Sequence, residues 1–186
     1  MSNELGLALL RIARGAIAER LGLPTQPAPD LPELEQPAAT FVTLTSEGAL
    51  RGCIGSLEPR VPLREDVRNN AIAAAFRDPR FPPLGLGEFG AARVEVSLLG
   101  ALEPVAMTDE IDVLRRLRPG IDGVVLTCGG HRATFLPQVW ESLPDPRHFL
   151  AQLKRKAGLA AGFWNEDLRL ARYQVTKWKE TLPVRM

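Results

Sequence analysis

The residues with the clearest potential for chemistry lie at positions 50–57, which read LRGCIGSL. Cys53, one of two cysteines in the chain, lies between Gly52 and Gly55 and close to Arg51. A cationic neighbour and nearby backbone N–H groups favour the thiolate, which is a nucleophile and a ligand for soft metals. The structural alternative is a small buried thiol between glycines that allow a neighbouring strand to approach closely.

A second candidate is His131, which follows two glycines and begins a predicted strand. Cys53 and His131 would form a nucleophile–base couple if the ends of two separate hairpins met in space. An exposed turn histidine is the alternative. Glu95 and Ser97 share one face of a predicted strand, where an acid could orient His131 or bind a metal. A solvated strand face explains these two residues more simply, and no metal site is predicted.

Several arginines accompany the first candidate. Because glycines expose backbone N–H groups, arginines beside them are suited to bind phosphate or carboxylate. The candidate anion-binding residues are Arg51, Gly52, Gly55, Arg77, Arg80 and Arg132. The alternative is that the arginines tie loops to helix ends, with Asp78 forming an ion pair with Arg77 or Arg80.

Hydrophobic spacing predicts the elements that must position these residues. Helices are predicted at 3–22, 62–78 and 146–157, with a short helix capped by Thr108. Hairpins are predicted at 39–57 and 124–136, and single strands at 92–99 and 168–179. The order hairpin, helix, strand therefore occurs twice. This order predicts an α+β fold with a mainly antiparallel sheet and flanking helices, organised as one domain over 1–186 with an internal duplication.

Composition limits the classes of partner. The chain has 186 residues and a formal net charge of +1, so no global field attracts nucleic acid or a membrane. Basic stretches at 154–156 and 177–179 would suit nucleic acid, but the near-zero net charge and the even mixing of basic and acidic residues favour solvated surfaces. The two cysteines lack the spacing of a zinc site, and no signal peptide or membrane-spanning run is evident. We expect a cytoplasmic protein with free thiols.

Five stretches resemble the signatures of the AMMECR family, and they occur in the family's order between about 41 and 178. They are LRGCIGSLEP at 50–59, NAIAAAFRDPRFPPL at 70–84, VEVSLL at 94–99, HRATFLPQVW at 131–140 and KRKAGL at 154–159. The chain is most similar to the bacterial branch called AmmeMemoRadiSam system protein A. The resemblance implies two unequal lobes around a cleft, and a three-part system with a Memo-like protein and a radical SAM protein.

The resemblance implies no particular reaction or cofactor, and this chain has too few cysteines to hold a radical SAM cluster itself. Two hypotheses follow. In the first, the chain binds or converts a small anionic substrate in a cleft, with Cys53 as nucleophile or ligand, His131 as acid or base and the arginines as anion clamps. In the second, it is a non-catalytic adaptor for the Memo-like or radical SAM partner or for RNA. Because the distinctive residues lie at turns, we favour the first.

Overall fold

A computed structural model describes residues 3–181, which divide into two compact units. Unit 1 contains the chain up to Leu99 together with the chain from Thr176 onward, and unit 2 contains Gly100–Val175. Unit 2 is therefore inserted in sequence between two parts of unit 1. The two hydrophobic cores share no residue. We describe each unit by itself.

The sheet of unit 1 has four strands in the order β2-β1-β3-β8. Its strands are β1 (Thr40–Ser46), β2 (Ala49–Gly55), β3 (Arg93–Leu99) and β8 (Val175–Lys179). β1 pairs antiparallel with both β2 and β3, so β2 is an edge strand. The β1–β2 turn contains Glu47 and Gly48, both with positive φ, as a tight hairpin requires.

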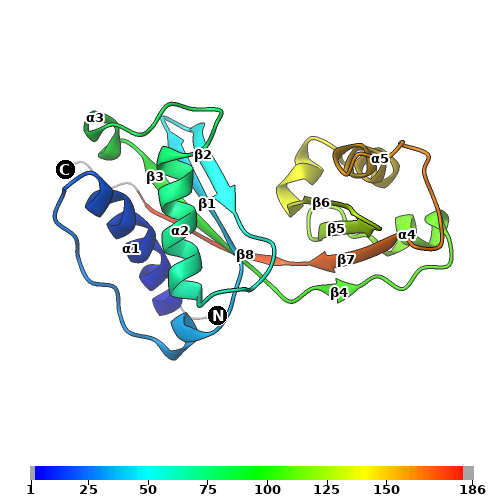
Figure 1. The fold of residues 1–186 in the computed structure, drawn as a ribbon, viewed down its shortest axis with the longest axis horizontal. Helices are drawn as coiled ribbons and strands as arrows, with labels where there is room; N and C mark the ends of the chain where they lie inside the picture. The colour runs from blue at the N-terminus through cyan, green and yellow to red at the C-terminus, as the bar shows by residue number, and fades with distance from the viewer. Residues whose placement is uncertain (1–2, 182–186) are drawn as a thin grey trace. The chain divides into compact units, whose positions relative to one another are not determined.

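Two helices, α1 (Asn3–Arg20) and α2 (Leu63–Phe76), lie side by side in unit 1 (Figure 1). Both pack against alternate strand residues, including Val42, Leu44 and Val94, which are completely buried. Because strand side chains alternate between faces, the residues between these point to the opposite face, which we call the far face. Two shorter helical segments complete the unit: η1 (Pro32–Glu35) and α3 (Leu86–Phe89).

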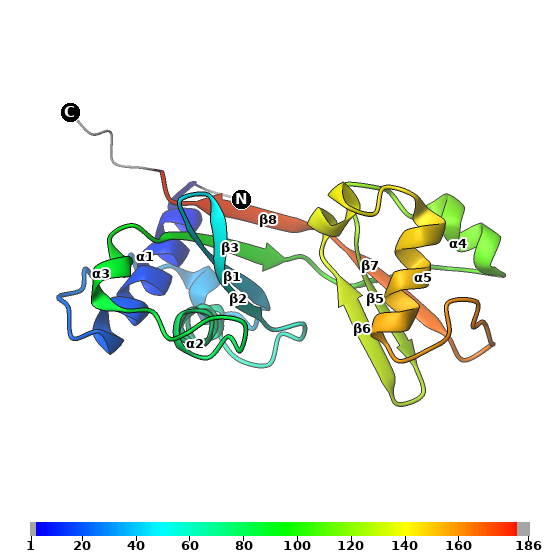
Figure 2. The same cartoon turned by 90° about the horizontal axis from the view of Figure 1, so that it is seen from above.

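Unit 2 has its own antiparallel sheet in the order β4-β7-β5-β6. Its strands are β4 (Glu103–Pro104), β5 (Gly123–Cys128), β6 (His131–Phe135) and β7 (Arg169–Tyr173). Its helical segments are α4 (Glu110–Arg116), η2 (Pro137–Glu141) and α5 (Pro146–Lys156). Helix α5 lies beside β6 (Figure 2). Its Phe149 stacks on Trp140 at a centroid distance of 3.7 Å, at the centre of this core.

The α+β class and the antiparallel pairing are confirmed. The predicted recurrence also has a topological counterpart. In unit 1 the run β1-β2-α2-β3 ends with β3 pairing antiparallel with β1, and in unit 2 the run β5-β6-α5-β7 ends with β7 pairing antiparallel with β5. In both units the second hairpin strand is an edge strand.

Three details differ from the sequence predictions. The single strand predicted at 168–179 is wrong, because the chain leaves β7 at Gln174 and enters β8, which belongs to the other sheet. Helix α4 is capped by Asp109, not Thr108; its carboxylate accepts a hydrogen bond from the backbone N–H of Asp112. α3 and β4, of four and two residues, are too short for a periodic pattern to reveal.

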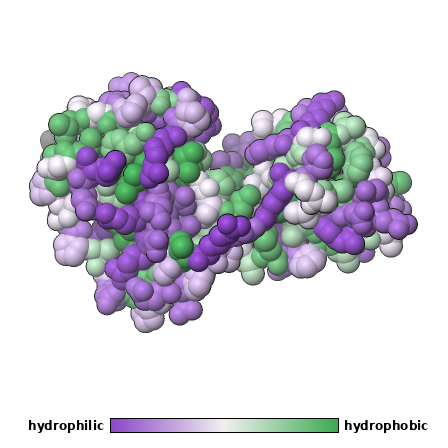
Figure 3. Space-filling view, viewed as in Figure 1, coloured by the Kyte–Doolittle hydropathy of each residue, from purple (hydrophilic) through white to green (hydrophobic). Residues whose placement is uncertain are grey.

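The surface of the described helices is mainly polar. Hydrophilic side chains dominate the parts of α1 and α2 that face the viewer, with small apolar areas between them (Figure 3). Within residues 3–181, no helix combines the length and the apolar character needed to cross a bilayer.

Candidate functional site

The position of Cys53 is fixed by the glycine before it. A Cβ atom at Gly52 would lie 2.2 Å from the backbone oxygen of Ala74 in α2, so only glycine allows β2 to pass this close to the helix. Position 52 thus faces α2, and the side chain of Cys53 points to the far face. Gly55 also allows a close approach, in this case to β1, since a Cβ there would lie 2.5 Å from the carbonyl oxygen of Thr40.

The outer edge of β2 is held by an aspartate and an arginine. The backbone N–H of Cys53 donates to Oδ2 of Asp78 at 2.9 Å, and the guanidinium of Arg80 donates to the Cys53 carbonyl at 3.1 Å. Asp78 and Arg80 also bond to each other at 2.7 Å. The two side chains use the backbone groups that a further strand would otherwise pair with. The backbone of Cys53 is therefore held by hydrogen bonds on the open edge of β2.

This pairing shifts the pKa values of both of its members. The hydrogen bond from Arg80 holds the pKa of Asp78 well below its ordinary value, with further help from the backbone N–H groups of Cys53 and Arg80. The pKa of Arg80 is raised, first by its hydrogen bond to Asp78 and then by the negative charge of Asp78, with smaller contributions from the Cys53 side chain. Asp78 is 1% exposed whereas Arg80 is 53% exposed. A solvent-accessible guanidinium is thus held beside Cys53, on its carbonyl oxygen.

A polar row crosses the far face from Cys53. Thr43 lies opposite both Cys53 and Glu95, and its hydroxyl donates to the sulfur at 3.4 Å. The Lys177 ammonium lies 3.9 Å from Oε1 of Glu95. Cys53, Thr43 and Glu95 are each partly exposed. We call these four residues the Cys53 row. It brings a thiol, a hydroxyl, a carboxylate and an ammonium onto one face of the sheet.

Arg51 is held elsewhere in unit 1. Its guanidinium donates to Glu88 at 2.7 Å and to the Pro82 carbonyl at 2.9 Å, and the residue is buried. The bond from Arg51 lowers the pKa of Glu88 to about 2, with a further contribution from the Gly85 N–H. Arg77 is exposed just after α2. Of the arginines in unit 1, Arg80 is therefore the one that lies against Cys53.

His131 and Arg132 lie in unit 2, whereas Cys53 lies in unit 1. His131 is exposed at the start of β6, and its Nδ1 donates to the Ala157 carbonyl at the end of α5, at 2.8 Å. The cysteine directly opposite His131 in the sheet is Cys128, which is buried and donates to Oδ1 of Asn165 at 3.4 Å. In unit 2, His131 thus caps the C-terminal end of α5 through this hydrogen bond.

The sequence alone did not identify Thr43 or Lys177 as neighbours of the candidate site. The only available signal was strand register. A bulge between Leu44 and Thr45 shifts that register, so Thr43 and its partner Cys53 lie at unequal distances from the hairpin turn. In the part of the chain that the structure describes, no cluster of three or more histidine, cysteine or acidic residues could hold a metal ion.

Comparison with known proteins agrees with this architecture. The AMMECR1 family model matches residues 10–178. The chain belongs to the AMMECR1 family. A relative from Methanothermobacter thermautotrophicus is 39% identical over 97% of this chain and 96% of its own length. Another, from Thermofilum pendens, is 36% identical over 98% of this chain and 93% of its own length.

A solved structure shows the same fold. The crystal structure of an uncharacterized protein from Pyrococcus horikoshii superimposes with a TM-score of 0.86 and 36% sequence identity, over 97% of this chain and 93% of that one. The fold described above is therefore also that of a solved protein with 36% sequence identity.

Proposed function

We propose that this AMMECR1-family protein binds a small anionic substrate on the far face of the unit 1 sheet, beside Cys53. The observation that carries the proposal is the exposed guanidinium of Arg80, which Asp78 and the Cys53 carbonyl hold beside Cys53. An arginine fixed in this way attracts an anion and stabilises negative charge on the thiol. Cys53 then acts as a nucleophile or as a soft ligand. His131 and Arg132, in unit 2, are not used in this proposal.

Native-state alkylation tests the role of the thiol. Iodoacetamide labelling, followed by peptide mass spectrometry between about pH 6 and 9, should modify Cys53 much faster than buried Cys128. Exposure alone would also favour Cys53, so arginine variants provide the decisive comparison. Arg80→Gln should slow labelling of Cys53 several-fold at neutral pH, whereas Arg80→Lys, which keeps the charge, should stay close to the unmodified protein.

The same assay tests anion binding. Inorganic phosphate should slow alkylation of Cys53 in the unmodified protein, and this protection should disappear in Arg80→Gln. Arg115→Gln, at an exposed position in unit 2, removes an equal charge and should leave the protection unchanged. Equal, slow labelling of both cysteines in the native state would contradict a reactive thiol. Phosphate protection that survives Arg80→Gln would contradict the anion site.

We also propose, from the resemblance alone, that the protein works in the cytoplasm alongside a Memo-like protein and a radical SAM protein as AmmeMemoRadiSam system protein A. The tagged chain should then co-purify with both proteins above a tag-only control, identified by mass spectrometry. An interaction that survives Cys53→Ser but fails with surface arginine changes would favour the adaptor function over a thiol-dependent reaction. Enrichment of neither protein would count against the three-part system.

A further inference from the structure

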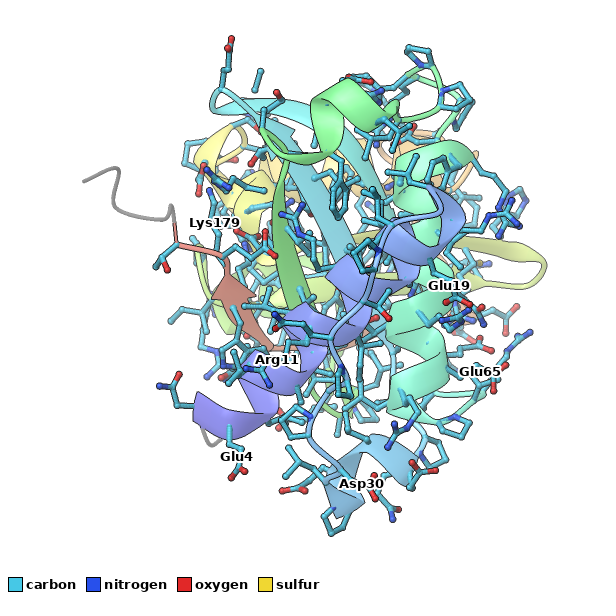
Figure 4. The ribbon with its side chains drawn as sticks, turned by 90° about the vertical axis from the view of Figure 1, so that its left-hand side faces the viewer. Glu4, Arg11, Glu19, Asp30, Glu65 and Lys179 are labelled. Carbon is cyan, nitrogen blue, oxygen red and sulfur yellow. The ribbon has the colours of Figure 1, made fainter. Side chains whose placement is uncertain are left out.

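A concave site lies on unit 1, away from Cys53. A groove of about 540 Å³ runs along α1 and is closed by the loop at 24–26, by Phe89 of α3 and by residues 179–181. Figure 4 looks onto this side of the unit, with Arg11 on α1 and Lys179 at the end of β8. The volume is in the range of small-molecule binding sites in proteins. The groove adjoins the end of β8, whereas Cys53 itself lies on β2, at the opposite edge of the sheet.

The groove offers apolar surface to a ligand. Leu7 is 47% exposed on its wall, although Leu5 and Leu9 of the same helix are buried in the core. Leu10 and Phe89 also line the groove and are only partly buried. Covering this surface with an apolar group would remove it from water, which is favourable.

The groove also carries an excess of positive charge. Its charged lining residues are four cations and one acid, namely Arg11, Arg14, Arg93, Lys179 and Glu180. Arg14 and Glu180 pair with each other at 2.9 Å, and Arg14 also donates to the carbonyls of Phe89 and Ala92. This pair is therefore internally neutral. Three cations of the lining remain to interact with a ligand.

The remaining cations are incompletely paired. Within residues 3–181, neither Arg11 nor Lys179 has an ion pair or hydrogen bond through its side chain, and both are exposed. The Nε donor of Arg93 is buried and has no acceptor in the same part of the chain. Burying a donor without an acceptor is costly, so one nitrogen of this guanidinium is left unsatisfied within residues 3–181. Positive charge and apolar surface thus occur in one groove.

We propose that this groove binds a small amphipathic anion, one carboxylate or sulfonate group on an apolar body. The apolar part lies against Leu7, Leu10 and Phe89, and the acidic group lies toward Arg11 and Lys179. The proposal does not rest on the function proposed for Cys53, since no residue is shared between the two sites.

Fluorescence of anilinonaphthalene sulfonate, a probe with one sulfonate on an aromatic body, tests this site in the full chain. The unmodified protein should bind the probe at one site, more weakly as ionic strength rises. Arg11→Gln should weaken binding about tenfold, as expected for loss of a charge-assisted contact. Leu7→Ser should weaken it several-fold. Both side chains are exposed, so neither change disturbs the core.

Matched controls remove the same groups elsewhere. Arg20→Gln takes one charge from the end of the same helix, outside the groove, and Ile111→Ser replaces an apolar side chain that is 55% exposed in unit 2. Both should leave probe affinity within about twofold. Decanoate should displace the probe, and decanol, which has the same chain without the charge, should displace it poorly. Absence of probe binding, equal effects of Arg11→Gln and Arg20→Gln, or equal displacement by decanol would each overturn the proposal.

Discussion

At Cys53, the backbone and the side chain are held by different groups. Asp78 and Arg80 hold the N–H and the carbonyl, and Thr43 donates to the sulfur. The Asp78 carboxylate is 1% exposed and bonds to both Cys53 and Arg80. It therefore connects the edge strand to the arginine. The stability of the site should therefore depend on that single carboxylate.

Replacing Asp78 by asparagine tests this dependence. The amide cannot neutralise Arg80, and its NH₂ group cannot accept the hydrogen bonds that a carboxylate oxygen accepts. We expect Asp78→Asn to lower the free energy of unfolding by about 1–3 kcal/mol at neutral pH, measured by urea denaturation. The control is Asp30→Asn, whose pair with Arg64 is at the surface with the carboxylate 93% exposed; its effect should be within about 0.5 kcal/mol.

Acid pH should reduce the difference between Asp78→Asn and the unmodified protein. The folded-state pKa of Asp78 lies below its ordinary value of 3.8, so the unfolded chain takes up the proton first as pH falls. The contribution of the carboxylate is therefore fully present above about pH 4 and is lost as pH falls toward the folded-state pKa. A difference in unfolding free energy that grows toward acid pH would contradict this account.

At the scale of elements, the contact between β2 and α2 determines where the thiol points. Gly52 allows the strand to pass against the backbone of Ala74, and the next side chain is thereby directed to the far face. The sequence predicted a glycine-dependent close approach, but it favoured a neighbouring strand as the second element. The structure shows that at Gly52 this element is a helix, which only the tertiary packing decides.

Gly52→Ala tests that contact. The new Cβ would lie 2.2 Å from a backbone oxygen of α2, so β2 or the helix must shift. We expect a loss of about 1–3 kcal/mol in the free energy of unfolding, typical of overpacking a core. The control is Gly87→Ala in α3, where an added Cβ meets no atom within 4 Å; stability there should be unchanged or slightly increased. Equal effects of the two changes would contradict the role of the close contact.

Other elements show what sequence patterns reveal and what they miss. An aspartate followed by a proline is typical of a helix start, and Asp145 caps α5: its carboxylate accepts from the N–H groups of Arg147 and His148. Caps and hairpin turns are local, so residue types identify them. The break between β7 and β8 at Gln174 is not determined locally. The alternation of side chains continues from β7 into β8, and this pattern does not indicate which sheet each strand joins.

At the scale of the whole molecule, the candidate site illustrates the same limit. The sequence identified residues 50–57 as the informative stretch, but it named Arg51 as the cationic neighbour of the thiol. Arg51 is closer in sequence, yet it bonds to Glu88, and the loop after α2 brings Arg80 to Cys53. His131 belongs to the other unit, an assignment that depends on how the chain divides.

That division predicts how the molecule loses structure. Leu44 in unit 1 and Leu153 in unit 2 are both fully buried, each in a core that contains no residue of the other. Leu→Ala in a core costs about 2–5 kcal/mol. Because the cores are separate, we expect the loss to be local. Native-state hydrogen exchange should show Leu153→Ala accelerating exchange of β5 amides with little change in β1, and Leu44→Ala producing the reverse.

The two substitutions serve as controls for each other, because residue type, burial and chemical change are the same. If either one accelerated exchange equally in β1 and β5, the two cores would open together, and the molecule would behave as one cooperative unit. Separate opening would instead mean that the Cys53 row, carried by the strands of unit 1, keeps its geometry when the core of unit 2 is weakened. The thiol reactivity of Cys53 in Leu153→Ala then reports on unit 1 alone.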